Sequence, residues 1–482
     1  MVLSLNNNNI WKLFKLEEFS GNISVIAGNK KISYKELHKL SNNFESLIRK
    51  RCLVFIICKN CVESISGYLG VFQSGAVPVL LNETINRLQL EKLIEKYRPA
   101  YIFLPSVKNK TILNKTIIDT IGSYDFCKTG LDHDYNIHND LALLLTTSGS
   151  TGSPKFVRQS YKNILSNAKS ISKYLEIKST DRAITTLPMS YSYGLSIINT
   201  HLLNGAAVIL TEASLMDRIF WDEIREQEAT TFGGVPYTYE MLDKLRFDRI
   251  DLPNINYLTQ AGGKLDLTLA KKFADICVNN NIKFYVMYGQ TEATSRMSYL
   301  PWEMAQSKSG SIGKAIPGGK FTIFDDDGII IEGSDTPGEL VYSGDNVTMG
   351  YAESHFDLGK GDENGGVLYT GDIAKRDEDG YYYIVGRKKR FLKMFGNRLN
   401  LDEVEKIVKE LGYECACAGT DDNLMIYITK PEEKTSVLEY VSKQTGINRL
   451  GFSLIQIDKI PRGNSGKVQY SALKHNMNEC NV

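Results

Sequence analysis

The stretch DLALLLTTSGSTGSPKFVRQSYKN, residues 140–163, holds the strongest clue to the fold and chemistry of this chain. An apolar run enters a loop of serine, threonine and glycine, and Lys155 follows the loop. Glycine lets backbone amides come close to a ligand, and hydroxyl groups add hydrogen-bond donors. This composition predicts a phosphate-binding loop.

The loop does not have the pattern of a Walker-type nucleotide loop. That pattern is G-x-x-x-x-G-K-[ST], and it runs into a helix. Here Gly149 and Gly152 are too close together, and Pro154 separates the second glycine from the lysine. Phe156 stands where a magnesium-binding hydroxyl belongs, and the following residues, FVRQS, have an extended pattern. We therefore predict that the loop joins two strands.

Composition sets limits on the partners of the protein. The 482 residues are 42% hydrophobic and 23% charged, which is typical of globular domains. The 57 basic and 56 acidic residues leave a net charge of +1, so no basic field is available to recruit nucleic acid. No apolar run approaches the ~20 residues that span a bilayer. The N-terminus lacks the pattern of a signal peptide, so we expect a cytoplasmic protein with no membrane span.

The eight cysteines are scattered and do not indicate a disulfide framework. Cys58 and Cys61 form a C-x-x-C pair, but no second pair follows at zinc-finger spacing. Cys415 and Cys417 alternate in ECACAGT, which is typical of a short strand with small residues facing inward. We interpret these residues as reduced structural thiols, and we predict no metal site among them.

Three segments each read as a buried strand, an amphipathic helix and a second buried strand. They cover residues 52–82, 182–212 and 257–289. Such β-α-β units predict parallel sheets with helices on their faces. In each unit the first strand runs into a polar or glycine-rich loop, the place where open α/β sheets bind ligands.

The pattern changes twice towards the C-terminus. From about Gly310, short alternating strands with glycine turns indicate a small antiparallel β subdomain. After Arg387 a helix is predicted with Asn400 as its N-cap, an apolar face from Leu401 to Leu411, and Gly412 at its end. The predicted architecture is a large α/β domain, residues 1–388, joined by a hinge to a small α+β domain, residues 389–482.

Five motifs together resemble those of the adenylate-forming superfamily. They are TTSGSTGSPK, YGQTEAT (288–294), YTGD (369–372), GRKKRFLKMFGNRLNLDEVE (386–405) and PRGNSGK (461–467). They occur in the family's order and cover most of the chain. The superfamily includes acyl- and aryl-CoA synthetases, the adenylation domains of peptide synthetases, D-alanine–carrier protein ligases and firefly luciferase.

The resemblance implies a reaction in two steps. A carboxylate attacks the α-phosphate of ATP and yields an acyl-adenylate and pyrophosphate, with Mg²⁺ as the metal. A thiol then displaces AMP. The implied partners are a small carboxylic acid and either coenzyme A or a separate acyl carrier protein, so the chain is similar to an AMP-forming acid–thiol ligase.

Residue roles follow from the same resemblance. The phosphate loop would comprise Thr147, Ser148, Gly149, Ser150, Thr151, Gly152 and Lys155. The remaining nucleotide contacts would come from Gly262, Gly263, Tyr288, Gly289, Thr291, Asp372 and Arg387. Tyr288 would stack on adenine, and Asp372 would accept the ribose hydroxyls.

The implied catalytic residues are Lys467, Glu292 and Lys155. Lys467 would neutralise charge on the attacking carboxylate and the α-phosphate, and Glu292 would bind Mg²⁺ with Thr147. Other positions are assigned to the acid pocket (Tyr191, Ser192, Ala261), to the hinge (Lys389) and to the thiol tunnel (Lys393, Gly396).

The chain departs from the family pattern at two places. Phe156 replaces the glycine that usually follows the loop lysine, and Tyr191 stands where many members have histidine. No acidic residue occurs from Leu187 to Leu203, where amino-acid-activating members carry an aspartate. A buried ammonium without a counter-charge is unfavourable, so we expect an acid without an α-amino group. The alternatives are a stand-alone amino-acid adenylation enzyme and a non-catalytic nucleotide-binding protein.

Overall fold

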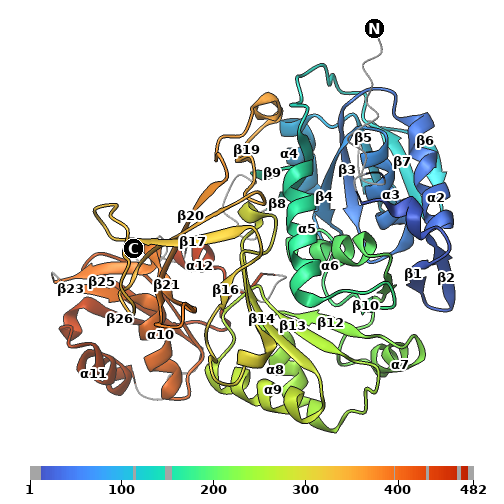
Figure 1. The fold of residues 1–482 in the computed structure, drawn as a ribbon. Helices are drawn as coiled ribbons and strands as arrows, with labels where there is room; N and C mark the ends of the chain where they lie inside the picture. The colour runs from blue at the N-terminus through green and yellow to red at the C-terminus, as the bar shows by residue number, and fades with distance from the viewer. Residues whose placement is uncertain are drawn as a thin grey trace. The chain divides into compact units, whose positions relative to one another are not determined.

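The computed structural model describes residues 12, 14–111, 115–146, 155–395, 397–429, 434–463 and 468–475 (Figure 1). The chain forms two compact units. The first consists of Met1–Thr147, Ser153–Phe321 and Tyr342–Leu368, and the second of Ser148–Gly152, Thr322–Val341 and Tyr369–Val482. The predicted boundary between residues 388 and 389 falls inside the second unit, and it stays a prediction.

One sheet of the first unit has nine strands among the described residues. Their order is β16 (Lys314–Ala315), β15 (Ser298–Leu300), β14 (Lys283–Tyr288), β13 (Tyr257–Gln260), β12 (Thr231–Gly234), β10 (Arg182–Ile184), β11 (Ala207–Leu210), β1 (Ile23–Ala27) and β2 (Lys30–Ser33). The central strands are parallel, and β2, β15 and β16 are antiparallel to their neighbours. The predicted β-α-β units at 182–212 and 257–289 are therefore confirmed.

The second sheet of this unit has eight described strands. Their order is β19 (Tyr351–Ala352), β9 (Phe156–Ser160), β8 (Leu141–Thr146), β4 (Val77–Asn82), β3 (Leu53–Cys58), β5 (Tyr101–Pro105), β7 (Tyr124–Lys128) and β6 (Thr116–Ile121). Strands β3 and β4 are parallel in register Leu53↔Val77, which confirms the β-α-β unit at 52–82. Every residue of β3 is buried, as expected for a parallel strand covered on both faces.

Helices cover the faces of both sheets. They are α2 (Tyr34–Leu47), α3 (Val62–Gln73), α4 (Arg87–Tyr97), α5 (Tyr161–Leu175), α6 (Ser192–Leu203), α7 (Arg218–Glu226), α8 (Pro236–Lys244) and α9 (Leu267–Asn279). One core joins β3 and β8, α3, α5 and α6, and β11 of the other sheet, so these helices lie between the sheets (Figure 1). A second core packs α7, α8 and α9 on the opposite face of the nine-stranded sheet.

Local sequence explains where the central helices begin. Ser160 caps α5, because its side chain accepts from the Asn163 amide while the Asn163 side chain accepts from the Ser160 amide. Asp266 caps α9 by accepting from the amides of Thr268 and Leu269. These caps fix the ends of the two helices that follow β9 and β13.

The antiparallel subdomain predicted after Gly310 is present. Its strands are β17 (Gly319–Phe324), β18 (Gly338–Gly344), β20 (Val367–Arg376) and β21 (Tyr382–Arg387), in that order in one sheet. The pair β20–β21 is antiparallel and places Asp372 opposite Arg387.

The C-terminal part of the second unit is α+β. Its elements are β22 (Phe391–Met394), β23 (Asn397–Asn400), α10 (Leu401–Glu410), β24 (Cys415–Thr420), β25 (Asn423–Ile428), α11 (Lys434–Thr445), β26 (Phe452–Gln456) and α12 (Tyr470–His475). Asn400 caps α10 as predicted, by accepting from the Asp402 amide.

Two details of this part differ from the sequence interpretation. Leu411 is exposed, because it lies at the C-cap of α10 rather than on its buried face. In β24 both faces are buried, with the cysteines in one core and the alanines in another, because this strand is packed on two sides.

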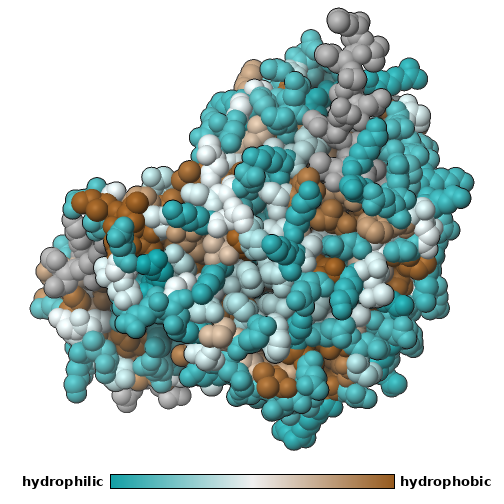
Figure 2. Space-filling view, viewed as in Figure 1, coloured by the Kyte–Doolittle hydropathy of each residue, from teal (hydrophilic) through white to brown (hydrophobic). Residues whose placement is uncertain are grey.

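No helix in the described part of the chain is long and apolar enough to cross a membrane. The face drawn in Figure 2 is dominated by hydrophilic residues, and hydrophobic residues appear on it in small groups. Scattered groups of this kind are normal on a folded protein.

Candidate functional site

The predicted phosphate loop connects two antiparallel strands. Strands β8 and β9 are paired with Thr146 opposite Phe156, and residues 147–154 join them. The loop residues Thr147, Ser148, Gly149, Ser150, Thr151 and Gly152 lie outside the described residues. The strand after Lys155 confirms that the connection is not a Walker loop, which would run into a helix.

Lys155, Tyr351 and Glu292 form a chain of contacts at the end of this loop. The Lys155 Nζ lies 3.5 Å from the centroid of the Tyr351 ring, a cation–π contact. The Tyr351 hydroxyl donates to the Glu292 Oε1 over 2.7 Å. Burial, and next the nearby Glu292 carboxylate, raise the pKa of Tyr351, so the hydroxyl stays protonated and donates. The structure therefore brings together two of the predicted catalytic residues through a tyrosine that sequence analysis missed.

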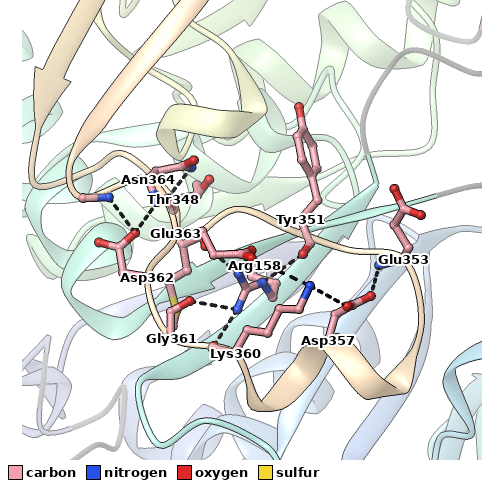
Figure 3. Close-up of polar contacts among 12 residues, drawn as sticks. Arg158, Thr348, Tyr351, Glu353, Asp357, Lys360, Gly361, Asp362, Glu363 and Asn364 are labelled. Carbon is pink, nitrogen blue, oxygen red and sulfur yellow. Dashed lines mark hydrogen bonds and ion pairs between the residues drawn. The ribbon is translucent and has the colours of Figure 1, made fainter.

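A fully buried arginine holds the segment that carries Tyr351. Arg158 of β9 donates to the backbone carbonyls of Met349, Tyr351, Lys360 and Gly361 and pairs with the Glu363 carboxylate (Figure 3). The distances to the Met349 and Lys360 carbonyls are both 2.6 Å. Arg158, which follows Lys155 by three residues in the chain, thus holds the backbone of Tyr351.

The YGQTEAT motif forms a tight turn between β14 and β15. A Cβ on Gly289 would lie 1.7 Å from the Ser295 carbonyl oxygen, so no side chain fits at this position. Thr294 and Ser295 both adopt positive φ, 55° and 108°. The Asn346 side chain donates to the Ala293 carbonyl at 2.8 Å and locks the turn. The turn presents Glu292 in the short helix Thr291–Ala293.

Three loops of the predicted site, those after β10, β13 and β14, leave the sheet at one edge, because these strands and β12 are parallel. After β13 comes Gly262 with φ of 86°, and a Cβ there would lie 2.6 Å from the Tyr191 hydroxyl. Ala261 is buried, and Gly263 is exposed beside Pro236. The tyrosine predicted to border the acid pocket therefore lies against Gly262, the first of the two glycines predicted to border adenine.

The first turn of α6 touches the YGQTEAT turn directly. The hydroxyls of Ser192 and Thr291 are 3.2 Å apart, and both residues are buried. Burial raises the pKa of Tyr191, which therefore acts as a neutral hydroxyl at this position. Tyr288 is half-buried, and its hydroxyl accepts from the Gln290 side chain at 3.3 Å. The first unit thus gathers Tyr191, Ser192, Gly262 and Thr291 in one place.

In the second unit, Asp372 and Arg387 form an ion pair across β20 and β21. The Arg387 Nε lies 2.9 Å from the Asp372 Oδ1, and the carboxylate is buried while the arginine is exposed. The Asp372 amide also donates to the Thr370 hydroxyl at 3.1 Å. The two residues predicted to contact ribose are therefore neighbours, and the Thr370 hydroxyl fixes the backbone from which the carboxylate extends.

A model of the AMP-binding enzyme family matches residues 15–352. This chain belongs to that family. Among curated relatives, the 2-succinylbenzoate–CoA ligase of Geobacillus sp. (strain WCH70) is 26% identical over 418 residues, covering 83% of this chain and 82% of that protein. The oxalate–CoA ligase of Arabidopsis thaliana is 25% identical over 487 residues, covering 92% of this chain and 93% of that protein.

The fold matches solved structures as well. The O-succinylbenzoate coenzyme A synthetase of Bacillus subtilis, in complex with ATP and magnesium ion, superposes with a TM-score of 0.75 at 22% identity. The match covers 97% of this chain and 99% of that one. The predicted superfamily, the fold class and the prediction of an enzyme are confirmed for this AMP-binding enzyme.

Several predicted residues of the AMP-binding enzyme lie outside the described residues. They are the loop residues named above, Gly396 and Lys467. The backbone of Lys389 is placed between β21 and β22, and that of Lys393 is placed in β22, but their side chains are not described. Their roles as hinge and thiol tunnel stay predictions.

The hinge motif contains one residue whose role the sequence did not reveal. Arg390, in the basic run RKKR, is buried, and its guanidinium pairs with Asp402 at 2.7 Å and with Glu405 at 2.5 Å. It also lies 3.8 Å over the Tyr470 ring. This basic run is therefore not only a solvated linker, since one of its arginines is part of the core of the C-terminal region.

The C-x-x-C pair runs from the end of β3, which is Cys58, to the N-cap of α3, which is Cys61. Cys58 is buried and Cys61 is half-buried, and burial raises the pKa of both thiols. The Cys61 Sγ lies 3.4 Å from the Ser64 hydroxyl. A raised pKa keeps a thiol protonated and poorly reactive, which favours a structural role.

Proposed function

We propose that this AMP-binding enzyme activates a carboxylic acid with ATP and transfers the acyl group to a phosphopantetheine thiol. In the first step a carboxylate oxygen forms a bond to the α-phosphorus, and the bond between that phosphorus and the pyrophosphate oxygen breaks. In the second step the thiol sulfur bonds to the acyl carbon, AMP leaves, and the thiol proton is released to solvent. The observation that carries the proposal is the Lys155–Tyr351–Glu292 chain at the predicted phosphate loop.

Each residue has a part that its position supports. Lys155 at the loop end places a cation where the β- and γ-phosphates would lie, and Tyr351 keeps it there. Tyr191 and Ser192, with the buried Ala261, border the acid. Asp372 would accept the ribose hydroxyls, with Arg387 beside it. Lys467 would stabilise the negative charge that develops at the α-phosphate.

The residues present fit a magnesium ion with ATP. Glu292 is a half-buried carboxylate with its Oε1 held by Tyr351, and Mg²⁺ prefers oxygen ligands of this kind alongside phosphate oxygens and water. Glu292, together with the Thr147 hydroxyl, would hold the ion, which would offset the negative charge of the phosphates. The Bacillus subtilis synthetase with ATP and magnesium ion supports this cofactor set.

Two observations favour an acid without an α-amino group. The segment 187–203 contains no acidic residue, and α6 buries its serines and tyrosine there rather than a carboxylate. The two curated relatives described above are named for 2-succinylbenzoate and oxalate, which carry no amino group. Their names also favour coenzyme A as the thiol, with a carrier protein as the alternative acceptor.

A panel of carboxylic acids tests the proposal. Purified protein is incubated with MgATP and each acid, and AMP and pyrophosphate are measured with and without coenzyme A. We expect AMP release that depends on both the acid and the thiol. Pyrophosphate exchange stimulated only by amino acids would indicate the amino-acid adenylation enzyme, and the absence of exchange with every acid would indicate a non-catalytic nucleotide-binding protein.

A further inference from the structure

A second buried arginine of the first unit lies behind the acid pocket. Arg296 follows the YGQTEAT turn directly and is 3% exposed. Its guanidinium carbon lies 3.9 Å over the Tyr193 ring, and its Nε donates to the Met287 Sδ at 3.4 Å. Its Nη1 donates to the Ser295 hydroxyl. A thioether and a neutral hydroxyl are weak acceptors for a charged donor.

Arg296 has no carboxylate partner among the described residues, although a guanidinium is always charged. Among the same residues its hydrogen bonds come from Nε and Nη1, and none comes from Nη2. The two other arginines that the structure describes as buried, Arg158 and Arg390, are both paired with glutamate. A buried charge without a counter-charge is strongly unfavourable. A cation left unpaired in this way is suited to binding an anion that arrives with a ligand.

A cavity of about 20 Å³ opens beside Arg296. Its lining is partly polar and includes Ser196, Thr200, Thr231 and Thr259. Met287, near the end of β14, and Arg296, just after the YGQTEAT turn, also line it. A space of this size holds about one water molecule. A ligand group that enters this cavity must therefore be small.

The cavity lies one helical turn from the predicted acid site. Ser192, predicted to border the acid, and Ser196, which lines the cavity, are four residues apart on α6, so their Cβ atoms are ~5–6 Å apart. Tyr191 and Tyr193 connect the two places, with ring centroids 6.3 Å apart. A short acid with its reacting carboxylate near Tyr191 can place its other end near Arg296.

We propose that Arg296 is the anion subsite of the acid pocket, and that the substrate is a short acid with a second carboxylate at its far end. This inference rests on the proposed function and names its substrate class. The small cavity excludes long fatty chains. The unpaired cation also disfavours an α-ammonium group in this pocket, which is a second reason, independent of the missing aspartate, against amino acids.

Pairs of acids matched in chain length test the subsite. Succinate is compared with butyrate, and phthalate with benzoate, by kcat/KM for AMP release. We expect the dicarboxylates to be preferred by at least about tenfold in the parent protein. Arg296→Met should lower kcat/KM for the dicarboxylates about 100-fold, mainly through KM, and leave the monocarboxylates unchanged or faster. Arg296→Lys keeps the charge and should recover part of the preference.

Two outcomes would overturn the subsite. One is equal use of both members of each pair by the parent protein. The other is an Arg296→Met protein that loses the same factor with all acids, which would show a structural role only. If no acid supports AMP release, the proposed function fails instead, and calorimetric binding of succinate against butyrate to the parent and to Arg296→Met still decides whether the subsite exists.

Discussion

Arg158 and Arg296 are both buried in the first unit, yet their surroundings are opposite. Arg158 meets four backbone carbonyls and the Glu363 carboxylate (Figure 3). Arg296 meets a thioether, a serine hydroxyl and a tyrosine ring. A guanidinium whose donors all bond to oxygen atoms holds its neighbours in place. A guanidinium without a counter-charge is still able to bind an anion. The partners alone therefore distinguish Arg158, a cation with a structural role, from Arg296, the cation proposed to bind substrate.

The largest expected effect is a loss of stability when Arg158 is replaced. Arg158→Met would remove the donor to the buried Met349 carbonyl and to three partly buried carbonyls, and the half-exposed Glu363 carboxylate would keep its ion pair with Lys360. We expect the free energy of unfolding, measured by urea unfolding, to fall by about 3–5 kcal/mol, because a buried acceptor that loses its donor costs about 1–3 kcal/mol and Arg158 serves four carbonyls. Arg218→Met is the control, because that side chain is 92% exposed and its pair with Asp222 is worth about 0.5 kcal/mol. Equal stability of both variants would contradict the structural role of Arg158.

The next largest effect is expected on activity, when the hydroxyl of Tyr351 is removed. Tyr351→Phe keeps the ring under Lys155 and removes the hydrogen bond to Glu292. We expect kcat/KM for MgATP to fall about tenfold and the magnesium concentration needed for half-maximal rate to rise. Tyr135→Phe, whose hydroxyl donates to the Arg98 carbonyl and is not part of the Lys155–Tyr351–Glu292 chain, serves as the control. An unchanged magnesium dependence would show that Tyr351 does not position the ion's carboxylate.

A smaller effect is expected when Arg296→Met is tested for stability rather than activity. Replacing an uncompensated buried cation with an apolar side chain of similar length is often neutral or stabilising. We expect the free energy of unfolding to stay within about 1 kcal/mol of the parent value or to rise. A loss as large as that of Arg158→Met would remove the distinction between the two arginines.

The smallest effect concerns His201, which lines the same cavity. Burial holds the pKa of His201 below its usual value of about 6.5, with Ile197, Tyr257 and Asp181 around it. The unfolded chain therefore binds the proton more readily, so stability is lost as the pH falls below about 6.5. The slope from this group is at most about 1.4 kcal/mol per pH unit.

The variant His201→Gln isolates this contribution. We expect its unfolding free energy to depend less on pH between about pH 7 and pH 5 than that of the parent protein, by urea unfolding at each pH. Identical pH profiles would show that His201 does not titrate differently in the folded state.

The family and the fold could be predicted from the sequence because their signals are local and occur in a fixed order. The β-α-β units, the N-caps such as Asn400 and the strand after Lys155 depend on residues near one another in the chain. The YGQTEAT motif likewise predicted Glu292 as a site residue from one short stretch of sequence. Patterns of this kind can be recognised in the sequence without knowledge of the structure.

Contacts between distant segments could not be predicted in this way. Tyr351 reaches Glu292 across 59 residues, and Arg158 reaches Glu363 across 205. In the sequence Arg158 and Arg296 look alike, since each is one cation in a polar context. Only the fold shows that one is surrounded by oxygen atoms and that the other is not.

The most direct test of the account follows an oxygen atom. The enzyme is incubated with MgATP, coenzyme A and succinate labelled with ¹⁸O, or with whichever acid of the panel is turned over, and the products are examined by mass spectrometry. Because the carboxylate attacks the α-phosphorus, the account predicts one ¹⁸O atom in AMP and none in pyrophosphate. Label in inorganic phosphate, or AMP without label, would contradict it.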